Sequence, residues 1–292
     1  MSDGGNQAAP APATAASPTP AAPRSELALR VVSALVMAGA ALGTAWAGGW
    51  VFGLFWTLAA ILALREWLTL IGLEGGRRQI SWLLGSLGIA YAGLLAEASA
   101  AADPRAWSVV GLAAGAVALS APGGRRLWSL AGVAVCAVVA VVPIDLRGHP
   151  AHALVAVLWL FCVVWGSDIA AYFAGRALGG PKLWPRVSPK KTWSGAIGGL
   201  VGGTACAVAL VMAADAGGHG WYHGLPLVAL TLVASVVSIL GDLAESALKR
   251  AFAVKDSSSL IPGHGGVLDR LDSFWAVCVL IGLIVYVFGG PR

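Results

Sequence analysis

Long stretches without any Asp, Glu, Lys or Arg fill most of this chain of 292 residues. Beyond residue 30, eight such stretches contain 18 residues or more, and in order they cover 31–64, 79–96, 106–124, 127–144, 148–167, 192–214, 216–241 and 273–291. Apolar runs of about 18 residues or more are typical of helices that span a bilayer. Charged residues make up 11% of the chain, whereas a soluble globular domain contains about 25%. The pattern excludes a disordered, coiled-coil or ordinary water-soluble protein and predicts an all-α integral membrane protein.

The first of these runs is too long for one membrane helix. Its 34 residues would form a helix of about 51 Å, whereas the hydrocarbon core of a bilayer is about 30 Å thick. Gly48 and Gly49 interrupt the run near its middle and favour a tight turn there. We therefore expect nine transmembrane helices.

The Lys and Arg residues predict the orientation, because cytoplasmic connections carry an excess of them. With a cytosolic N-terminus and alternating spans, 16 of the 19 fall inside, namely Arg24, Arg30, Arg65, Arg77, Arg78, Arg125, Arg126, Arg176, Lys182, Arg186, Lys190, Lys191, Lys249, Arg250, Lys255 and Arg270. Arg105, Arg147 and Arg292 fall outside. We therefore expect a multi-pass protein of the cell's inner or plasma membrane, with its C-terminus outside and its functional face toward the cytosol.

Two domains of very different character are expected. Residues 1–25 are rich in Ala and Pro and contain no aromatic residue, which predicts a disordered cytosolic tail. Residues 26–292 form the multi-pass membrane domain. Its two long polar connections, about 176–191 and 246–272, lie on the cytosolic side, and neither has a β-strand pattern. Function is therefore sought in these connections.

Five carboxylates gather at the cytosolic ends of three predicted helices. They are Asp168, Asp242, Glu245, Asp269 and Asp272. Ionisable groups in a membrane helix are energetically costly, so each is a candidate functional residue. Carboxylate oxygens without a histidine cluster favour a hard cation such as Mg²⁺ over zinc. The alternative is that these acids form salt bridges at helix ends with Lys249, Arg250, Lys255 and Arg270.

Basic residues crowd the connection before residue 193 in a complementary way. Lys182, Arg186, Lys190 and Lys191 lie there, and the sequence SPKKT at 188–192 is predicted to open the next helix. Free N–H groups at a helix N-terminus favour phosphate. The alternative is a positive-inside anchor on the anionic leaflet. In either case the basic residues meet phosphates or lipid headgroups, and no nucleic-acid partner is expected.

The sequence IPGHGG at 261–266 predicts a flexible turn whose glycines let the backbone approach a nucleotide closely. His264 alone cannot form a zinc site, so it is interpreted as a loop residue or a phosphate contact. Acidic residues, basic residues and a glycine-rich turn at a membrane surface together favour phosphoryl or nucleotidyl transfer onto a lipid. The sequence contains no GxSxG, no P-loop and no HExxH.

The segment 246–272, SALKRAFAVKDSSSLIPGHGGVLDRLD, resembles the signature of the phosphatidate cytidylyltransferase (CDP-diacylglycerol synthase) family. The matching fixed positions are Ser246, Lys249, Arg250, Lys255, Asp256, Pro262, His264, Gly265, Gly266, Asp269, Arg270 and Asp272. Further similar pieces are RVVSALVMA near the start, REW at 65–67, SDIAAYFAGR at 167–176 and SPKKT. The resemblance covers most of the chain beyond the tail, more loosely across the third to fifth helices. Small departures are Ser194, where Glu or Gln is common, and Ser258, where Gly is common.

The resemblance implies the reaction of CTP with phosphatidate to give CDP-diacylglycerol and diphosphate. It also implies a cation centre with Mg²⁺, and K⁺ as a second cation, held by Asp242 and Asp269, with Asp168, Asp272 and Glu245 as further candidate ligands. The expected catalytic residues are Asp242, Asp269, Lys255, Arg270 and Asp272. The expected substrate-binding residues are Ser188, Lys190, Lys191, Thr192, Lys249, Arg250, His264, Gly265 and Gly266.

Asp242 and Asp269 are 27 residues apart, so they share one centre only if the segment 246–268 folds back as a loop over the bundle. Two other functions are weighed against this one. A CTP-dependent kinase of a membrane lipid alcohol would need an activated hydroxyl, and a transporter would distribute its ionisable residues across the membrane depth. The expected partners are CTP, phosphatidate, membrane lipids and a second copy of the chain, through one of the glycine-rich helices.

Overall fold

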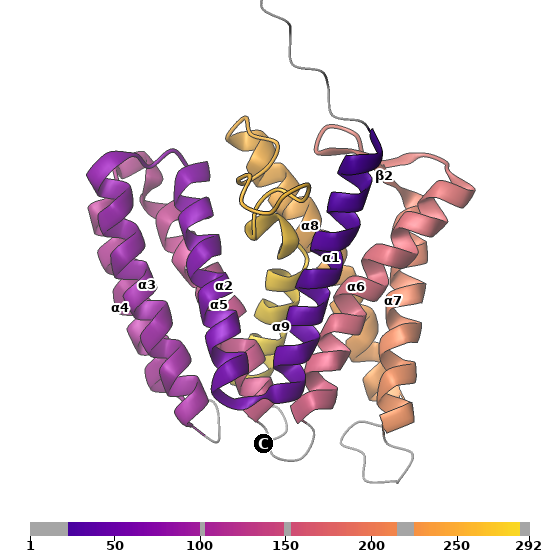
Figure 1. Cartoon of the computed structure of the whole chain (residues 1–292), viewed down its shortest axis with the longest axis horizontal. Coiled ribbons are helices and arrows are strands. Elements are labelled where there is room, and N and C mark those ends of the chain that lie inside the picture. The colour runs from indigo at the N-terminus through magenta and orange to yellow at the C-terminus, as the bar shows by residue number, and fades with distance from the viewer. Residues whose placement is uncertain (1–22, 100–102, 149–152, 215–224, 287–292) are drawn as a thin grey trace, which may run out of the picture.

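The computed structural model describes residues 23–99, 103–148, 153–214 and 225–286. In these ranges the chain folds into nine α-helices that run up and down beside one another (Figure 1). They are α1 (Pro23–Ala47), α2 (Gly49–Leu70), α3 (Gly75–Ala98), α4 (Pro104–Ser120), α5 (Arg126–Gly148), α6 (Ala153–Leu178), α7 (Trp193–Ala214), α8 (Leu225–Ala251) and α9 (Phe274–Tyr286). Two 3₁₀ turns, η1 (Gly123–Arg125) and η2 (Leu268–Arg270), and two short strands, β1 (Lys182–Trp184) and β2 (Ser188–Thr192), complete the described elements.

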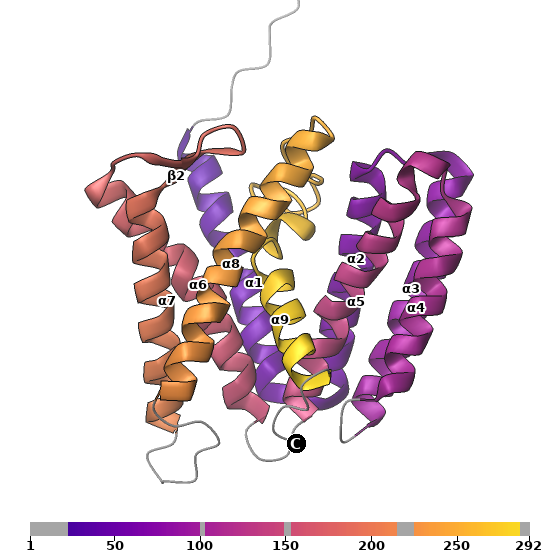
Figure 2. The ribbon, with the colours of Figure 1, turned by 180° about the vertical axis from the view of Figure 1, so that it is seen from behind.

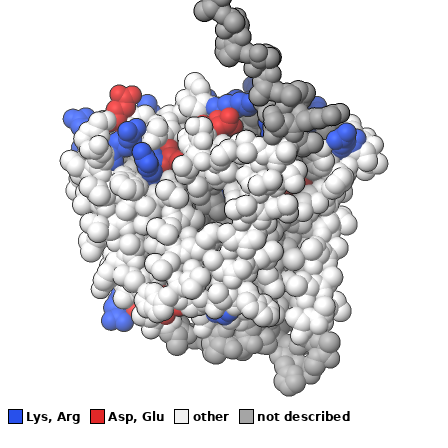
Figure 3. Space-filling view, viewed as in Figure 1, with Lys and Arg blue, Asp and Glu red and all other residues white. Residues whose placement is uncertain are grey.

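Helix length and composition agree with a membrane environment. Seven helices of the described ranges are long and apolar enough to cross a bilayer, while α4 has 17 residues and α9 has 13. Charged side chains gather at the two ends of the bundle and leave a broad uncharged band between them (Figure 3). The prediction of an all-α membrane protein is confirmed at this level. The number of crossings and the side on which each terminus lies stay predictions.

The first predicted run divides as expected. α1 ends at Ala47 and α2 begins at Gly49, and both Gly48 and Gly49 have positive φ values, of 64° and 50°. The left-handed region is accessible to glycine at little cost. The predicted tail at 1–25 falls mostly outside the described residues, since these begin at Pro23, the first residue of α1.

The connection before α7 differs from the prediction. Ser188–Thr192 forms strand β2, antiparallel to β1, and α7 begins after it at Trp193. The expectation that this segment opens the helix, and that the connection has no strand, is therefore wrong. A residue before proline disfavours the helical region, which keeps Ser188 extended ahead of Pro189. Thr192 then caps the helix, because its Oγ1 accepts a hydrogen bond from Gly195 N at 3.1 Å.

α6 and α7 pack closely along a seam of small residues. A Cβ at Gly199 would lie 2.9 Å from Ser167 O, and one at Gly195 would lie 3.0 Å from Ala171 O. Glycine at these positions is what lets the two backbones approach. The seam fixes the β1–β2 hairpin relative to Asp168, the residue after Ser167.

Aromatic residues fill the centre of the bundle where α2, α6 and α9 meet. Trp56 stacks on Phe274 with ring centroids 4.5 Å apart, and Phe161 lies 6.0 Å from Trp56. All three side chains are buried. α9 lies between α8 and the α2–α5 pair in both ribbon views (Figure 2). This packing fixes the first turn of α9, directly after the polar segment that carries Asp269 and Asp272.

Candidate active site

The segment between α8 and α9 lies at the end of the bundle where α1 begins, as does the β1–β2 hairpin (Figures 1 and 2). The predicted loop at 246–268 is shorter than expected, because α8 continues to Ala251. The helix ends in a Schellman turn, in which Val254 N donates to Lys249 O at 2.9 Å and Ala253 N to Arg250 O at 3.1 Å. Ala253 has a φ of 55°. The loop that follows is residues 252–267, and we call it the signature loop.

A tight turn forms the tip of the signature loop. Ile261 N donates to Gly265 O at 2.7 Å, and Gly263 and Gly265 have φ values of 75° and 79°. His264 Nδ1 lies 2.6 Å from Ser33 Oγ of α1. Burial, followed by the charges of Arg270 and Arg30, holds the pKa of His264 below its ordinary value. The histidine therefore joins the loop tip to α1 in the described structure.

Asp269 is surrounded by hydrogen-bond donors. Its Oδ2 accepts from Ser257 N at 2.8 Å, Ser257 Oγ at 2.9 Å and Gly266 N at 2.8 Å, while its Oδ1 accepts from Lys249 Nζ at 2.9 Å. Burial disfavours its charged form, but the hydrogen bonds from Gly266, Lys249 and Ser257 hold its pKa below the ordinary value. A Cβ at Gly265 would lie 2.6 Å from Oδ2. Asp269 thus remains an anion that gathers the loop around it.

Glu66 of α2 is a second loop-binding carboxylate, and the sequence analysis did not select it. Its Oε1 accepts from Ser258 Oγ at 2.6 Å and Val267 N at 3.1 Å. Its Oε2 accepts from Leu268 N at 2.8 Å and lies 3.0 Å from Ser257 Oγ, whose one hydroxyl proton it shares with Asp269 Oδ2. Two signals were available: Glu66 lies one residue beyond the end of an uncharged run, as Asp168 lies at the end of another, and it belongs to the REW segment at 65–67.

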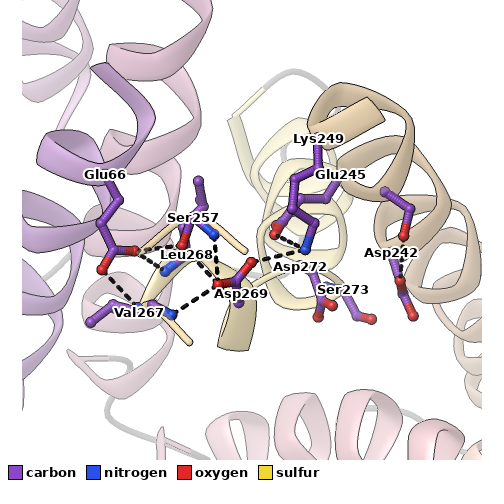
Figure 4. Close-up of polar contacts among 12 residues, drawn as sticks. Glu66, Asp242, Glu245, Lys249, Ser257, Val267, Leu268, Asp269, Asp272 and Ser273 are labelled. Carbon is purple, nitrogen blue, oxygen red and sulfur yellow. Dashed lines mark hydrogen bonds and ion pairs between the residues drawn. The ribbon is translucent and has the colours of Figure 1, made fainter. Parts of the chain in front are cut away.

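Lys249 connects this arrangement to α8. Its Nζ donates to Asp269 Oδ1 at 2.9 Å and to Glu245 Oε1 at 3.2 Å. Glu245 Oε2 is buried and has no hydrogen-bond partner in the described ranges. Lys249, expected to contact substrate, therefore lies between two carboxylates. Figure 4 shows Asp269 between Glu66 and Lys249, and we call Glu66, Lys249, Ser257, Ser258 and Asp269 the loop-holding cluster.

A second group of carboxylates lies on the other side of Lys249. Asp242 forms an ion pair with Lys191 of β2, and its Oδ1 is 3.4 Å from Ser246 Oγ. Asp272 Oδ1 accepts from Ser273 N at 2.9 Å. Burial, followed by the charges of Asp242 and Asp168, raises the pKa of Asp272. We call Asp168, Asp242 and Asp272 the acidic cluster, because the charges of Asp242 and Asp168 both act on Asp272.

Several predicted basic residues remain available to an anionic ligand. Their side chains are exposed, and none of them forms an ion pair within the described part of the chain: Lys182, Arg186, Lys190, Arg250, Lys255 and Arg270. Arg270 lies in η2, directly after Asp269. These exposed cations therefore surround the two clusters at the same end of the bundle.

The remaining predicted substrate contacts have partners within the protein. Ser188 is half-buried in β2, and Thr192 is buried as the cap of α7. A Cβ at Gly266 would collide with Ser257 Oγ and with Glu66 Oε2. The close backbone approach expected at Gly265 and Gly266 is thus made to Asp269 and Glu66. Whether these residues also contact a nucleotide stays a prediction.

The donor chemistry suits a hard cation. All candidate ligands, Asp168, Asp242, Glu245, Asp269 and Asp272, offer carboxylate oxygens, and they outnumber Lys191 and Lys249, which are paired with them. Among the described residues, no group of three or more His, Cys, Asp or Glu is arranged so that it could hold a metal ion. Asp242 and Asp269 have separate lysine partners, and no described contact joins them. The shared cation centre stays a prediction.

Comparison with known proteins gives consistent results over most of the chain. The model of the Cytidylyltransferase family matches residues 28–288. A phosphatidate cytidylyltransferase of Brucella suis biovar 1 (strain 1330) is 40% identical over 271 residues, which are 91% of this chain and 96% of that protein. Those of Haemophilus influenzae and Bacillus subtilis are 46% identical over 127 residues and 41% identical over 150 residues. These shorter matches cover 44% and 50% of this chain, and 44% and 52% of those proteins.

Proposed function

Because the chain belongs to the cytidylyltransferase family and is therefore a nucleotidyltransferase, we propose that it transfers the cytidylyl group of CTP to phosphatidate. The products are CDP-diacylglycerol and diphosphate. The observation that carries this proposal is the relative named phosphatidate cytidylyltransferase, which matches 91% of the chain. The complete signature at 246–272 supports it, because this segment lies at the polar end of an apolar bundle.

The chemistry asks for charge neutralisation and alignment. A phosphate oxygen of phosphatidate attacks the α-phosphorus of CTP, and the bond from that phosphorus to the oxygen bridging the β-phosphate breaks. The attacking oxygen is already anionic at neutral pH, so the reaction needs no general base. It needs two anions held in line while negative charge moves to diphosphate. The exposed side chains of Lys190, Lys255 and Arg270 are suited to hold the phosphates.

We place Mg²⁺ with Asp242 and Asp269 as its main ligands and with Asp168, Asp272 and Glu245 nearby. When bound, Mg²⁺ supplies positive charge at the α-phosphate. K⁺ is the second cation that the family resemblance implies. Two observations support a cation here: burial, followed by the charges of Asp242 and Asp168, raises the pKa of Asp272, and Lys249 is the single described donor at Asp269 Oδ1. Lys191 and Lys249 would then exchange part of their contact with the carboxylates for contact with substrate.

The proposed topology is nine crossings with a cytosolic N-terminus, an outer C-terminus and an active site on the cytosolic side of the cell membrane. The 16-to-3 division of Lys and Arg supports it, and so does the alternation of helix direction in Figure 1. A reporter fused after Arg292 is expected outside, and one inserted in the hairpin near Lys182 is expected in the cytosol. Both reporters on the same side would exclude this topology.

A direct assay tests the reaction. Detergent-purified protein is supplied with phosphatidate, CTP and Mg²⁺, and the expected products are CDP-lipid and diphosphate in equal amounts. A parallel reaction with diacylglycerol tests the kinase alternative, which would give phosphatidate and CDP without diphosphate. Diphosphate release that depends on phosphatidate supports the proposal, and CDP release with diacylglycerol alone would overturn it.

A further inference from the structure

We infer that Glu66 is a positioning residue for the proposed reaction, because it fixes the end of the signature loop and η2 so that Asp269 and Arg270 have one orientation. The inference rests on the proposed function. Glu66 belongs to α2, about 190 residues before its partners in sequence (separations of 191, 192, 201 and 202 residues). The fold therefore brings a distant helix to this loop through a single side chain.

The described partners of the Glu66 carboxylate are all hydrogen-bond donors. Val267 N and Leu268 N donate to its two oxygens, the hydroxyl of Ser258 donates to Oε1, and Oε2 shares the hydroxyl of Ser257 with Asp269. Glu66 is 5% exposed, so water cannot replace these bonds. A carboxylate accepts at both oxygens, whereas a glutamine amide has one NH₂ group that would face two of these donors. A buried donor left without an acceptor is costly, so the position requires an acid rather than any polar side chain.

The two backbone bonds fix the turn that carries the functional residues. Leu268 is the first residue of η2, and Asp269 and Arg270 complete that turn. Because Val267 and Leu268 are tied to Glu66, the start of η2 cannot shift along the bundle. Ser257 connects the two carboxylates, since its Oγ lies 3.0 Å from Glu66 Oε2 and 2.9 Å from Asp269 Oδ2. A displacement of Glu66 would therefore reach Asp269 through one side chain.

The part of α2 that carries Glu66 is itself fixed. Its neighbour Trp67 donates through Nε1 to Trp128 O of α5 at 2.8 Å. On the loop side, Phe252 packs edge-on against Trp128, with ring centroids 5.4 Å apart. Both the helix that carries Glu66 and the start of the signature loop therefore rest on α5. This gives Glu66 a rigid frame from which to position η2.

The test uses full-length protein in detergent and compares Glu66→Gln with wild type. The matched control is Glu74→Gln, because Glu74 is exposed and its side chain forms no capping hydrogen bond. Two properties are measured: hydrogen–deuterium exchange of the peptides that cover 257–270, and kcat and KM for CTP per folded molecule. We expect exchange at Val267 and Leu268 to accelerate by about tenfold or more, and kcat to fall by about ten- to a hundredfold. Glu74→Gln should match wild type in both.

Each result decides the inference. Normal exchange in Glu66→Gln, or faster exchange with unchanged kcat, would overturn it. A lower yield of folded protein with wild-type kcat and KM would show a purely structural role and would also overturn it. If Glu66→Gln does not fold, Ser258→Ala carries the same test, because it removes one donor from the half-buried rim of the cluster. An inactive wild type would refute the proposed function instead. The exchange data would still show whether Glu66 fixes the signature loop.

Discussion

The loop-holding cluster and the acidic cluster both contain buried or half-buried carboxylates, but the groups that surround these carboxylates differ. In the loop-holding cluster, Glu66 and Asp269 each accept three hydrogen bonds and share the hydroxyl of Ser257 as a further donor, and burial is compensated so well that the pKa of Asp269 lies below its ordinary value. In the acidic cluster, burial and the charges of Asp242 and Asp168 raise the pKa of Asp272.

The difference shows that burial alone does not set the charge of a carboxylate, because hydrogen-bond donors outweigh burial at Asp269 but not at Asp272. Backbone N–H groups and hydroxyls turn a buried acid into an anchor for a loop, while Asp269 Oδ1, whose described donor is Lys249 alone, keeps capacity for a further ligand. Acids that face one another keep their charge only with help from a cation. A functional division follows, in which the loop-holding cluster orients Asp269 toward the site and the acidic cluster supplies the further negative charge for a metal ion.

The largest effect is expected at the two acids that the proposal assigns to one cation centre. Asp242→Asn and Asp269→Asn should each abolish most turnover, because a hard-cation site loses an anionic oxygen. The double variant should be hardly worse than either single variant, since groups that act as one unit are strongly non-additive. Diphosphate release at saturating Mg²⁺ measures all three variants.

Hydrogen exchange separates the two acids in the same preparations. Asp269→Asn removes the negative charge that accepts from Ser257 N and Gly266 N and turns an NH₂ group toward Lys249 Nζ, so exchange in the signature loop should accelerate. Asp242→Asn should leave the loop protected, because its described partners are Lys191 and Ser246. If the two losses of activity multiply, the clusters act separately and the shared centre is wrong. If both variants loosen the loop, the division between the clusters fails.

A smaller loss of activity is expected from the exposed cations. Lys255→Ala and Arg270→Ala should each remove a charge-assisted phosphate contact, worth about 1.5–3 kcal/mol, and lower activity by about ten- to a hundredfold. Both side chains are exposed, so insertion, yield and loop exchange should match wild type. Wild-type kinetics in both variants would instead support the view that they are anchors at the membrane surface.

Mg²⁺ should stabilise the protein through the acidic cluster. A ligand at 100 times its Kd stabilises the folded state by about 2.7 kcal/mol, which is visible as a rise in the thermal midpoint in detergent. Wild type and Glu74→Gln should show the rise, whereas Asp242→Asn should lose it. Ca²⁺ and a matched concentration of NaCl serve as controls for ion size and ionic strength. An equal rise in Asp242→Asn would place the cation elsewhere.

Much of the fold was predictable because its determinants are local. The uncharged runs gave the described helices, and Gly48 and Gly49 gave the break between α1 and α2. The β1–β2 hairpin was missed because the strands have three and five residues, too short for an alternating pattern, and a proline near a helix start was misinterpreted. Helix periodicity at Ser246 and Lys249 should have extended α8 to Ala251.

The site was less predictable, for a physical reason. The sequence located the acids at one end of the bundle, but it could not say which acid would meet N–H donors, since that depends on contacts between distant segments. Glu66 has its partners near residues 257–268, and nothing local to α2 indicates this. Lys249 and Gly266 were expected to contact substrate, whereas the described structure uses both within the loop-holding cluster.

The smallest expected effect concerns the turn that delivers the chain to the loop-holding cluster. Ala253 occupies the left-handed position of the Schellman turn, with φ of 55°, where a Cβ is disfavoured and glycine is usual. Ala253→Gly should therefore stabilise the protein by about 1 kcal/mol. Ala251→Gly, two residues earlier in α8, is the matched control and should destabilise by about 0.5–1 kcal/mol. Thermal midpoints measure both variants, and kcat should be unchanged in Ala253→Gly.

Because the turn depends on backbone geometry and not on the carboxylates, the stability gained in Ala253→Gly should add to the stability lost in Ser258→Ala. A gain that disappears in the double variant would mean that the turn and the loop-holding cluster form one unit.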